Sequence, residues 1–406
     1  MVSKSKKSIT SPGSGKILQL HTDDVDYGYV KFPNDVKFIG SIAHNTKFGS
    51  GKAFVPVLRE IKGEKETHIY GFHPTSLQAQ HIAGPIKAPD GSSDVTVFGS
   101  HVDKQGMLYL CCWNRNSILV ANMNKVKGKA ETLFCEVEYE EIMKPKDVTT
   151  DPRNEKILYV AGSRDTSTGM VYKIVLDQPG GTDYQKSVQA DGFSTLAGIK
   201  VVNKEIWLCQ MYDIVSQDTK KSQSPAVQQW KGNDGKGNVW LANCINAFDT
   251  KYALCPAYKV LPEDVVDSVM KSSTSGSGLA SIFCCCKKDA SKALSLTHNE
   301  ENEEGGPIRL MFIDTLNVSK SVHMEIFLSE KNDKFSSKSG ITHVQHVVDS
   351  KKGKGVVACI NFEEPRILVM KDTAFRDIIK NETQLKVQKN TVQKKTVQKK
   401  TVQKKT

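Results

Sequence analysis

One pattern of residues occurs four times in this chain and limits what the chain can fold into. A β-rich apolar run, a tight turn and a second β-rich run appear in 99–122, 145–175, 196–215 and 346–370. In the first copy the turn falls at Asp103–Gly106, between the runs GSHV and MLYLCCW. Turn residues between two runs of β-branched and aromatic residues indicate antiparallel hairpins. The sequence therefore predicts an all-β protein.

The spacing of these copies indicates how the hairpins are assembled. The first three copies start roughly 40–50 residues apart, which is the period of the blades in a β-propeller. Further strands of the same kind are found in 29–41, 54–61, 67–72 and 237–249. We therefore predict a propeller of about six blades, with an open β-sandwich as the alternative. We expect the strand 15–20 to close the ring on the last blade, because closure removes an exposed sheet edge.

Three segments differ in composition from the repeats. Residues 262–306 pass through a Ser/Gly stretch into an acidic run, which predicts a mobile insertion loop. Beyond residue 380 the unit TVQKK recurs, with one valine in each unit and a period that fits no helix. We predict that 381–406 and the basic residues 1–14 are disordered, so that the folded domain covers 15–380.

The formal net charge of +11 lies at the two ends of the chain. The first 16 residues carry four lysines and no acid, and 376–406 carry ten Lys/Arg against two acids. The body is thus close to neutral, and the tail is expected to meet an anionic partner, such as nucleic acid, an anionic membrane or an acidic protein. The lysines that would carry this polyanion binding are Lys394, Lys395, Lys399, Lys400, Lys404 and Lys405.

The cysteines and the N-terminus indicate a reducing compartment. No stretch approaches the roughly 18 apolar residues of a membrane span, and the N-terminus lacks the apolar run of a secretory signal. The ten cysteines show no paired spacing, which favours a cytoplasmic protein over a disulfide scaffold. Several cysteines lie in apolar, strand-like runs and are expected to act as small hydrophobic residues, namely Cys111, Cys112, Cys209, Cys244 and Cys359.

Three adjacent cysteines form the most distinctive short motif. Cys284, Cys285 and Cys286 precede Lys287 and Lys288. This arrangement resembles a site of reversible S-palmitoylation, in which acyl chains enter the membrane and lysines meet anionic headgroups. It predicts a lipoprotein at the periphery of a membrane; a metal or redox role and no special role are the alternatives.

The repeats resemble a known group of propellers. The phrase VDKQGMLYLCCWNRNSILV is similar to the NHL repeat, and 145–175 resembles the repeats of gluconolactonase, strictosidine-synthase-like and paraoxonase-like propellers. The resemblance covers 96–215 and 340–370. It implies a six-bladed propeller whose functional residues lie where the inner strands converge at one end of a central channel.

The hydrolytic members of this group imply a calcium site. In them, oxygen ligands come from the residue before the glycine that begins an inner strand, since calcium takes several oxygen ligands. On our alignment this position is occupied in turn by Asn34, Phe98, Lys146 and Ala197. Asp35 and Asp147, one residue further on, could complete a calcium site with Asn34. Their alternative role is to bond backbone N–H groups at a turn or strand entry.

Histidines do not restore a metal site on this alignment. Peptide-amidating lyases, which resemble NHL proteins, hold zinc through histidines, but Phe98 and Lys146 occupy those positions here. His101, His343 and His346 lie in or beside inner strands but miss the ligand position, so we expect satisfied or surface histidines. The chain also lacks a Gly-rich phosphate loop, a GxSxG elbow and an HExxH motif.

Two functions stay open at this stage. The first is a non-catalytic propeller that presents its faces to protein partners, with the basic tail meeting an anionic partner. The second is a calcium-dependent hydrolase of a lactone or small ester, with Asn34, Asp35 and Asp147 as ligands. We favour the binding module over the enzyme, because a phenylalanine and a lysine stand where oxygen ligands are needed.

Overall fold

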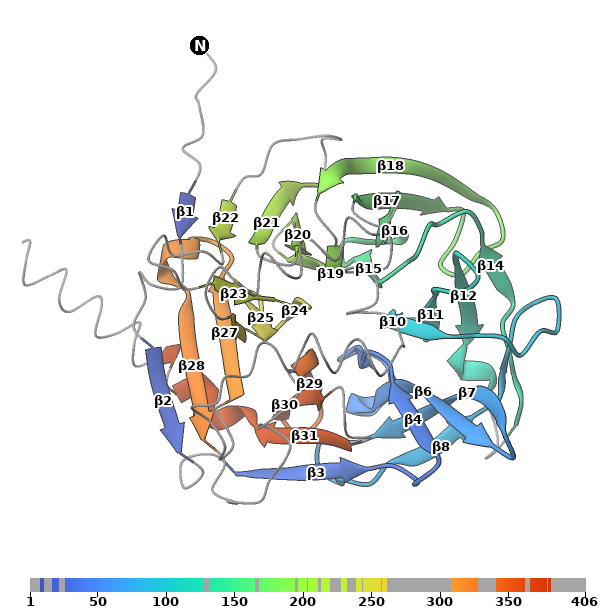
Figure 1. Cartoon of the computed structure of the whole chain (residues 1–406), viewed down its shortest axis with the longest axis horizontal. Helices are drawn as coiled ribbons and strands as arrows, with labels where there is room; N and C mark the ends of the chain where they lie inside the picture. Colours follow the sequence, from blue (N-terminus) through green and yellow to red (C-terminus); the bar gives the residue numbers. More distant parts are fainter. Residues whose placement is uncertain are drawn as a thin grey trace, which may run out of the picture.

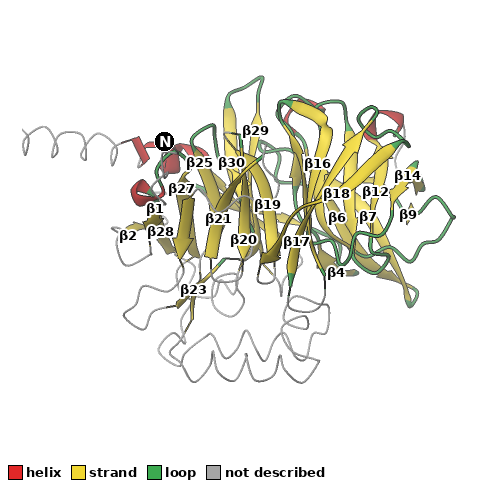
Figure 2. Cartoon of the chain, turned by 90° about the horizontal axis from the view of Figure 1, so that it is seen from above, coloured by secondary structure: helices red, strands yellow, loops and turns green. Residues whose placement is uncertain are grey.

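The structure, a computed structural model, contains six sheets of four or five strands arranged in a ring (Figure 1). The residues that it describes are 8–10, 17–21, 26–126, 131–164, 168–193, 196–202, 204–210, 213–219, 228–231, 239–242, 244–256, 258–260, 308–327, 341–361, 366–377 and 379–380. The prediction of an all-β, six-bladed propeller is confirmed. Seen from the side, the strands stand roughly along the ring axis (Figure 2).

Each of the first three blades is a meander of four antiparallel strands. Blade 1 contains β4 (Val36–Ile39), β6 (Ala53–Ile61), β7 (Glu64–Phe72) and β8 (Gln80–Ala83), with β5 (Ala43–His44) also paired to β6. Blade 2 contains β10 (Val97–Val102), β11 (Met107–Cys112), β12 (Ser117–Asn122) and β14 (Val137–Tyr139). Blade 3 contains β15 (Asp147–Asp151), β16 (Asn154–Ser163), β17 (Gly169–Leu176) and β18 (Tyr184–Phe193).

The other three blades each take a strand from the N-terminal part of the chain. Blade 4 contains β19 (Leu196–Val202), β20 (Glu205–Gln210), β21 (Asp213–Asp218), β22 (Gln228–Lys231) and β1 (Ser8–Thr10). Blade 5 contains β24 (Asn246–Ala247), β25 (Tyr252–Pro256), β27 (Ile308–Asp314), β28 (Val322–Phe327) and β2 (Ile17–His21). Blade 6 contains β29 (Ile341–Asp349), β30 (Lys354–Asn361), β31 (Arg366–Lys371) and β3 (Tyr27–Lys31).

Two small sheets lie outside the blades. The first is the parallel pair β9 (Ile86–Lys87) and β13 (Leu133–Phe134), and the second is the antiparallel pair β23 (Val239–Leu241) and β26 (Tyr258–Val260). Short 3-10 turns occur at Gly49–Gly51, Met123–Lys125 and Val318–Lys320, and 372–377 are helical. In the part of the chain that the structure describes, no helix has the length and apolarity needed to span a membrane.

The innermost strands form a closed circle around the axis. Each inner strand contacts the next one around the ring, in the order β5, β10, β15, β19, β24 and β29, and β29 contacts β5 again. Each blade thus begins at the axis and ends at the rim (Figure 1). Residues near the start of each inner strand are brought together although they are far apart in sequence.

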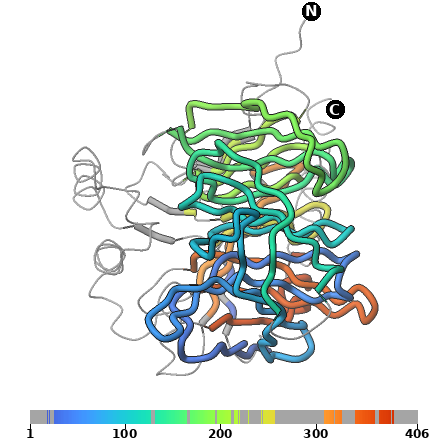
Figure 3. The backbone as a smooth tube through the Cα atoms, turned by 90° about the vertical axis from the view of Figure 1, so that its right-hand side faces the viewer, coloured from blue at the N-terminus to red at the C-terminus, as the bar shows by residue number. Residues whose placement is uncertain are grey.

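The strand that closes the ring differs from the one expected from the sequence. β3 pairs antiparallel with β31, with Tyr29 opposite Leu368, so the N-terminal strand completes the last blade. Figure 3 shows these blue and red parts of the chain side by side. The expectation that 15–20 closes the ring is wrong, because β2 instead adds in parallel to β28 of blade 5. The segment 29–41, expected to belong to one blade, is divided: β3 belongs to blade 6 and β4 to blade 1.

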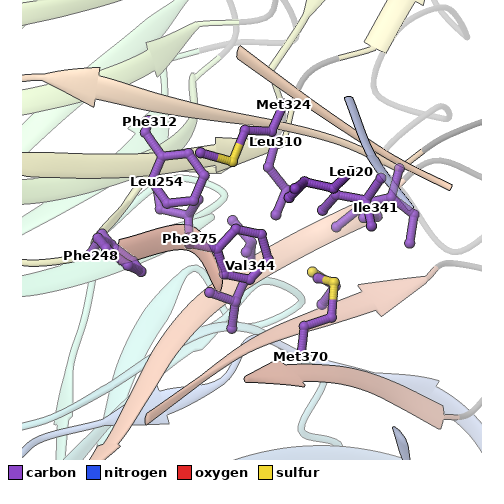
Figure 4. Packing of buried hydrophobic residues seen from close by; sticks show 14 of the residues in the cluster. Leu20, Phe248, Leu254, Leu310, Phe312, Met324, Ile341, Val344, Met370 and Phe375 are labelled. Carbon is purple, nitrogen blue, oxygen red and sulfur yellow. The ribbon is translucent and has the colours of Figure 1, made fainter. Parts of the chain in front are cut away.

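Apolar clusters hold neighbouring blades together. Six clusters occur among the described residues, and each combines side chains of two adjacent blades. Figure 4 shows the cluster between blades 5 and 6, where Leu254 and Phe312 lie near Val344 and Phe375.

The cysteines expected in strands are buried and unbridged, as predicted. Each blade buries both of its faces, which explains why strands such as MLYLCC are apolar along almost their whole length.

Glycine allows two inner strands to approach closely. A Cβ atom at Gly99 of β10 would lie 2.3 Å from the carbonyl oxygen of Lys146 and 2.6 Å from Cα of Asp147. A Cβ atom at Gly40, just after β4, would lie 3.1 Å from the carbonyl oxygen of Val97. The FIGS segment of blade 1 thus corresponds to VFGS of blade 2. The alignment that equates Asn34 with Phe98 is therefore wrong.

Candidate functional site

Each blade contributes one polar side chain to a cluster at the axis. The members of this axial cluster are His44, His101, Asp147, Lys200, Asn246 and His343. Lys200 of blade 4 interacts electrostatically with His44, His101, Asp147 and His343, which belong to four other blades. These residues lie on the inner strands, which form the closed circle around the axis. The Nδ2 of Asn246 lies 3.3 Å from Nε2 of His343 and links blade 5 to the cluster.

Lys200 and Asp147 are the charged members of the axial cluster. Lys200 lies deep in the ring, although part of its surface stays accessible. Burial lowers the pKa of its ammonium, and the charge of Asp147 opposes this. Burial raises the pKa of Asp147 to about 7, against the effect of hydrogen bonds and of Lys200. Among the described residues, Lys200 has no hydrogen-bond or salt-bridge partner for its side chain.

The histidines of the axial cluster are held neutral. Burial lowers the pKa of His44 to about 4 and that of His343 to about 3, and it lowers the pKa of His101 well below its usual range. The Nε2 of His44 accepts a hydrogen bond of 3.0 Å from the Val348 N–H, as a neutral ring can. His101 Nε2 lies 2.8 Å from Oγ1 of Thr150. Near neutral pH, the charge of the cluster therefore depends on Lys200 and Asp147.

A second group of side chains lies at the face where the inner strands begin. Ring centroids are 5.5 Å apart for Phe38 and Phe98, and 6.0 Å apart for Phe98 and Trp113. The Nζ of Lys144 lies 3.8 Å from the Trp113 ring centre, and the Nζ of Lys146 lies 4.9 Å from that of Phe98. All five side chains are partly exposed. We call this group the aromatic–lysine surface.

Lys144 is held in an unusual backbone conformation. Its φ of 45° lies in the left-handed region, which is costly for a residue with a Cβ atom. Its N–H donates a hydrogen bond of 3.0 Å to Oδ1 of Asn116, which fixes the loop before β15. No carboxylate forms a salt bridge with Lys144 within the described chain. Its neighbour Met143 is 41% exposed, so the surface offers positive charge beside apolar atoms.

The residues predicted to hold calcium lie in two different environments. Asn34 is exposed in the turn between β3 and β4, and Asp35 accepts a hydrogen bond of 3.0 Å from Nε of Arg59. This bond holds the pKa of Asp35 below its usual range. Asp147 accepts hydrogen bonds from the N–H groups of Val148, at 2.9 Å, and Ile199, at 3.0 Å.

A calcium ion needs several converging oxygens, and Asn34 and Asp35 lie in the turn before β4, whereas Asp147 is the first residue of β15. Within the described residues, no group of three or more His, Cys, Asp or Glu is arranged to hold a metal. The bonds of Asp147 are those of the alternative role foreseen for it, to backbone N–H groups. Calcium binding stays a prediction.

The expected histidines have partners, and sequence reasoning missed the residue at the centre. His101 and His343 bond Thr150 and Asn246, and His346 Nε2 lies 2.8 Å from Oδ2 of Asp372. Lys200 was not singled out from the sequence. A signal was present, because GSH and GIK each place a polar residue two positions after the inner-strand glycine.

Other predicted features lie outside the described residues. These are the insertion loop 262–306, the tail 381–406 with its six lysines, and the palmitoylation motif of Cys284, Cys285 and Cys286. They stay predictions. The lysines concerned are Lys394, Lys395, Lys399, Lys400, Lys404 and Lys405.

Comparison with known proteins does not assign the chain to a family. No family model matches the chain, and no curated protein matches it. The chain is similar to virginiamycin B lyase from Staphylococcus aureus, with 10% identity over 86% of this chain and 99% of that chain, at a TM-score of 0.45. It is similar to a luciferin-regenerating enzyme, with 8% identity over 85% and 95% of the two chains, at a TM-score of 0.46. A third similarity is to the Cps50 (Swd1) β-propeller domain of Myceliophteria thermophila, with 9% identity over 85% and 99%, at a TM-score of 0.44.

Proposed function

We propose that this protein is a non-catalytic binding module whose aromatic–lysine surface docks an acidic segment of a partner protein. The observation that carries the proposal is Lys144, a cation stacked on Trp113 with no carboxylate partner among the described residues. An acidic side chain of a partner would supply the missing counter-charge. The calcium-dependent hydrolase has less support, because Asp35 bonds Arg59 and Asp147 bonds backbone N–H groups.

The composition of the surface supports protein binding in particular. Aromatic residues and methionine are enriched at the cores of protein interfaces, and aromatic side chains often carry much of the binding energy. Phe98 and Trp113 offer flat rings next to Lys146, and Met143 is exposed beside them. A partner that alternates acidic and aromatic residues would match both properties of the surface.

The basic tail supplies a second anionic contact in this proposal. Its TVQKK units place about two lysines in every five residues. Binding through summed charge carries little sequence preference and weakens steeply as salt rises. The tail would therefore raise affinity for any acidic partner, whereas the aromatic–lysine surface would select among acidic partners.

A peptide selection tests the proposed surface. Random 12-residue peptides displayed on phage are selected against the full chain, against Lys144→Met/Lys146→Met and against Lys352→Met/Lys354→Met. The last pair is exposed in the β29–β30 turn at the opposite end of the inner strands. We expect the wild type and this control to enrich the same peptides, with acidic residues beside aromatic ones, and the Lys144/Lys146 variant to lose them.

Two outcomes would contradict the proposal. Selection of the same acidic peptides by the Lys144/Lys146 variant would place the binding elsewhere, for example in the tail. A wild type that enriches no acidic peptide would remove the basis for a docking surface. Fluorescence anisotropy of the selected peptides should further show affinity that falls between about 50 and 200 mM salt.

A further inference from the structure

We propose that the axial cluster is a binding site for a small oxyanion, a phosphate or a carboxylate, which contacts the ammonium of Lys200. This site differs from the aromatic–lysine surface and does not depend on the function proposed there. Among the described residues of the axial cluster, Lys200 is the strongly basic side chain that this site uses. Lys200 lies on the inner strand β19, no described residue bonds its side chain, and the histidines of the axial cluster are neutral.

Lys200 lies on the inner strand β19 and only part of its surface is accessible, so less water surrounds its ammonium than surrounds that of a surface lysine. A partly buried ammonium is stabilised by hydrogen bonds or by an opposite charge. No described residue bonds the Lys200 side chain, and the one carboxylate that interacts with it, Asp147, is already bonded to Val148 N–H and Ile199 N–H. An oxyanion at the axis would supply both the charge and the acceptor atoms that are missing.

The surroundings of Lys200 favour an anion over a cation. His44, His101 and His343 are neutral, so they add neither positive nor negative charge beside Lys200. The thiols of Cys111 and Cys244, which also interact with Asp147, are kept protonated because burial raises their pKa. A metal cation would meet Lys200 as a like charge.

Asp147 couples this binding to pH. Its carboxylate repels an oxyanion, but the repulsion disappears when the carboxyl group takes up a proton. Because its pKa is raised to about 7 by burial, the group is about ten times more protonated at pH 6 than at pH 8. The histidines of the cluster do not titrate in this range, since burial lowers the pKa of His44 to about 4 and that of His343 to about 3, and lowers the pKa of His101 well below its usual range.

Thermal unfolding of the full chain in defined salts tests the site. Sodium phosphate, sulfate and acetate are each compared with sodium chloride at equal ionic strength. The comparison uses the wild type, Lys200→Met and the exposed control Lys352→Met. We expect at least one oxyanion to raise the Tm of the wild type and the control in a concentration-dependent way, as mass action requires. Lys200→Met should show only the smaller rise that sulfate and phosphate give any protein through exclusion from its surface. The difference between phosphate and acetate identifies the preferred class of oxyanion.

The pH dependence gives a second test that does not need Lys200→Met to fold. Sulfate keeps its charge between pH 6 and 8, so calorimetric titration should give an affinity up to about tenfold higher at pH 6 in the wild type. Asp147→Asn should bind with nearly the same affinity at both pH values. The proposal is overturned if no oxyanion stabilises the wild type beyond chloride, if Lys200→Met responds like the wild type, or if sulfate affinity in the wild type ignores pH.

Discussion

The backbone N–H of Ile199 donates a hydrogen bond of 3.0 Å to Oδ2 of Asp147 and thereby joins the inner strands of blades 3 and 4. The other carboxylate oxygen accepts a hydrogen bond of 2.9 Å from the N–H of Val148. Burial still raises the pKa of this carboxyl group to about 7. A group that titrates near neutral pH thus lies at a junction between two blades, where its protonation affects stability.

The pKa of Asp147 predicts a stability that depends on pH. Between about pH 4 and 7 the folded protein holds a proton that the unfolded chain has released, so this residue's contribution is lost as pH rises through that interval. Asp147→Asn removes the titration. The free energy of unfolding of the wild type, relative to the variant, should therefore fall by up to about 1.4 kcal/mol per pH unit. Urea unfolding of both proteins at several pH values between about 4 and 7 measures this difference in the free energy of unfolding.

An exposed aspartate provides the control for this measurement. Asp377 lies on the surface of the helical segment 372–377, so Asp377→Asn removes a carboxylate outside the blade junction and should change the free energy of unfolding by about 0.5 kcal/mol or less. A difference between the wild type and Asp147→Asn that stays constant from about pH 4 to 7 would contradict the raised pKa of Asp147.

Ring closure by β3 predicts very different effects for two neighbouring residues. Val30 is fully buried in the cluster between blades 6 and 1, whereas Lys31 is exposed. Val30→Asp buries a charge and should lower the free energy of unfolding by about 3 kcal/mol or more. Lys31→Asp should change it by about 0.5 kcal/mol or less. Equal urea midpoints for the two variants would show that β3 does not hold the ring together.

The sequence predicted the blades well because their pairing is local. In blade 2, Cys112 pairs with Ser117 across a short turn, so both strands and the turn lie in one readable segment. Closure of the ring depends instead on Tyr29 meeting Leu368, and two short apolar strands near the N-terminus could each have filled that place. Which of them pairs with β31 depends on contacts with a distant part of the chain, and no local pattern reports those contacts.

The candidate site was predicted only in part for a related reason. Asp147 was recognised from its place at a strand entry, but its neighbour Lys200 joins it only once the blades form a ring. The error in blade 1 came from reading FPND as the strand start, when Gly40 of FIGS is the residue that packs against blade 2. Side chains that meet at an axis share no sequence proximity, so an alignment displaced by several residues misses them.

Close packing at Gly99 predicts a destabilising effect of a single methyl group. A Cβ atom there would lie 2.3 Å from the carbonyl oxygen of Lys146 and so push blades 2 and 3 apart. Gly99→Ala should therefore lower the free energy of unfolding by about 2 kcal/mol or more. The comparison is Gly63→Ala, in a turn with φ of 85° and nothing within 4 Å of the added atom, where backbone strain alone costs about 1 kcal/mol. If urea unfolding shows that Gly63→Ala lowers the free energy of unfolding more than Gly99→Ala does, the close contact between blades 2 and 3 at Gly99 does not have the predicted effect on stability.

The helical segment 372–377 is joined to the ring by a buried carboxylate. Oδ2 of Asp372 lies 2.8 Å from Nε2 of His346 and accepts a hydrogen bond of 2.8 Å from Nε of Arg376. The other ring nitrogen of His346 bonds the carbonyl oxygen of Phe248 in blade 5. Burial alone would raise the pKa of Asp372, but the bonds from His346 and Arg376 outweigh burial and lower it. Asp372 thus connects the end of the described chain to blades 5 and 6.

Removal of this carboxylate should be costly at neutral pH and less so in acid. Asp372→Ala leaves His346 without its partner and should lower the free energy of unfolding by about 3 kcal/mol, whereas Asp377→Ala, on the exposed side of the same segment, should cost about 0.5 kcal/mol or less. Because the pKa of Asp372 is lowered in the folded state, its charge stabilises the fold above the unfolded value of 3.8 and ceases to do so as pH falls through the folded value. Urea unfolding at neutral pH and at the lowest pH that keeps the fold should show the gap between wild type and Asp372→Ala narrowing. A gap of the same size at both pH values would mean that packing, rather than the charge of Asp372, ties this segment to the ring.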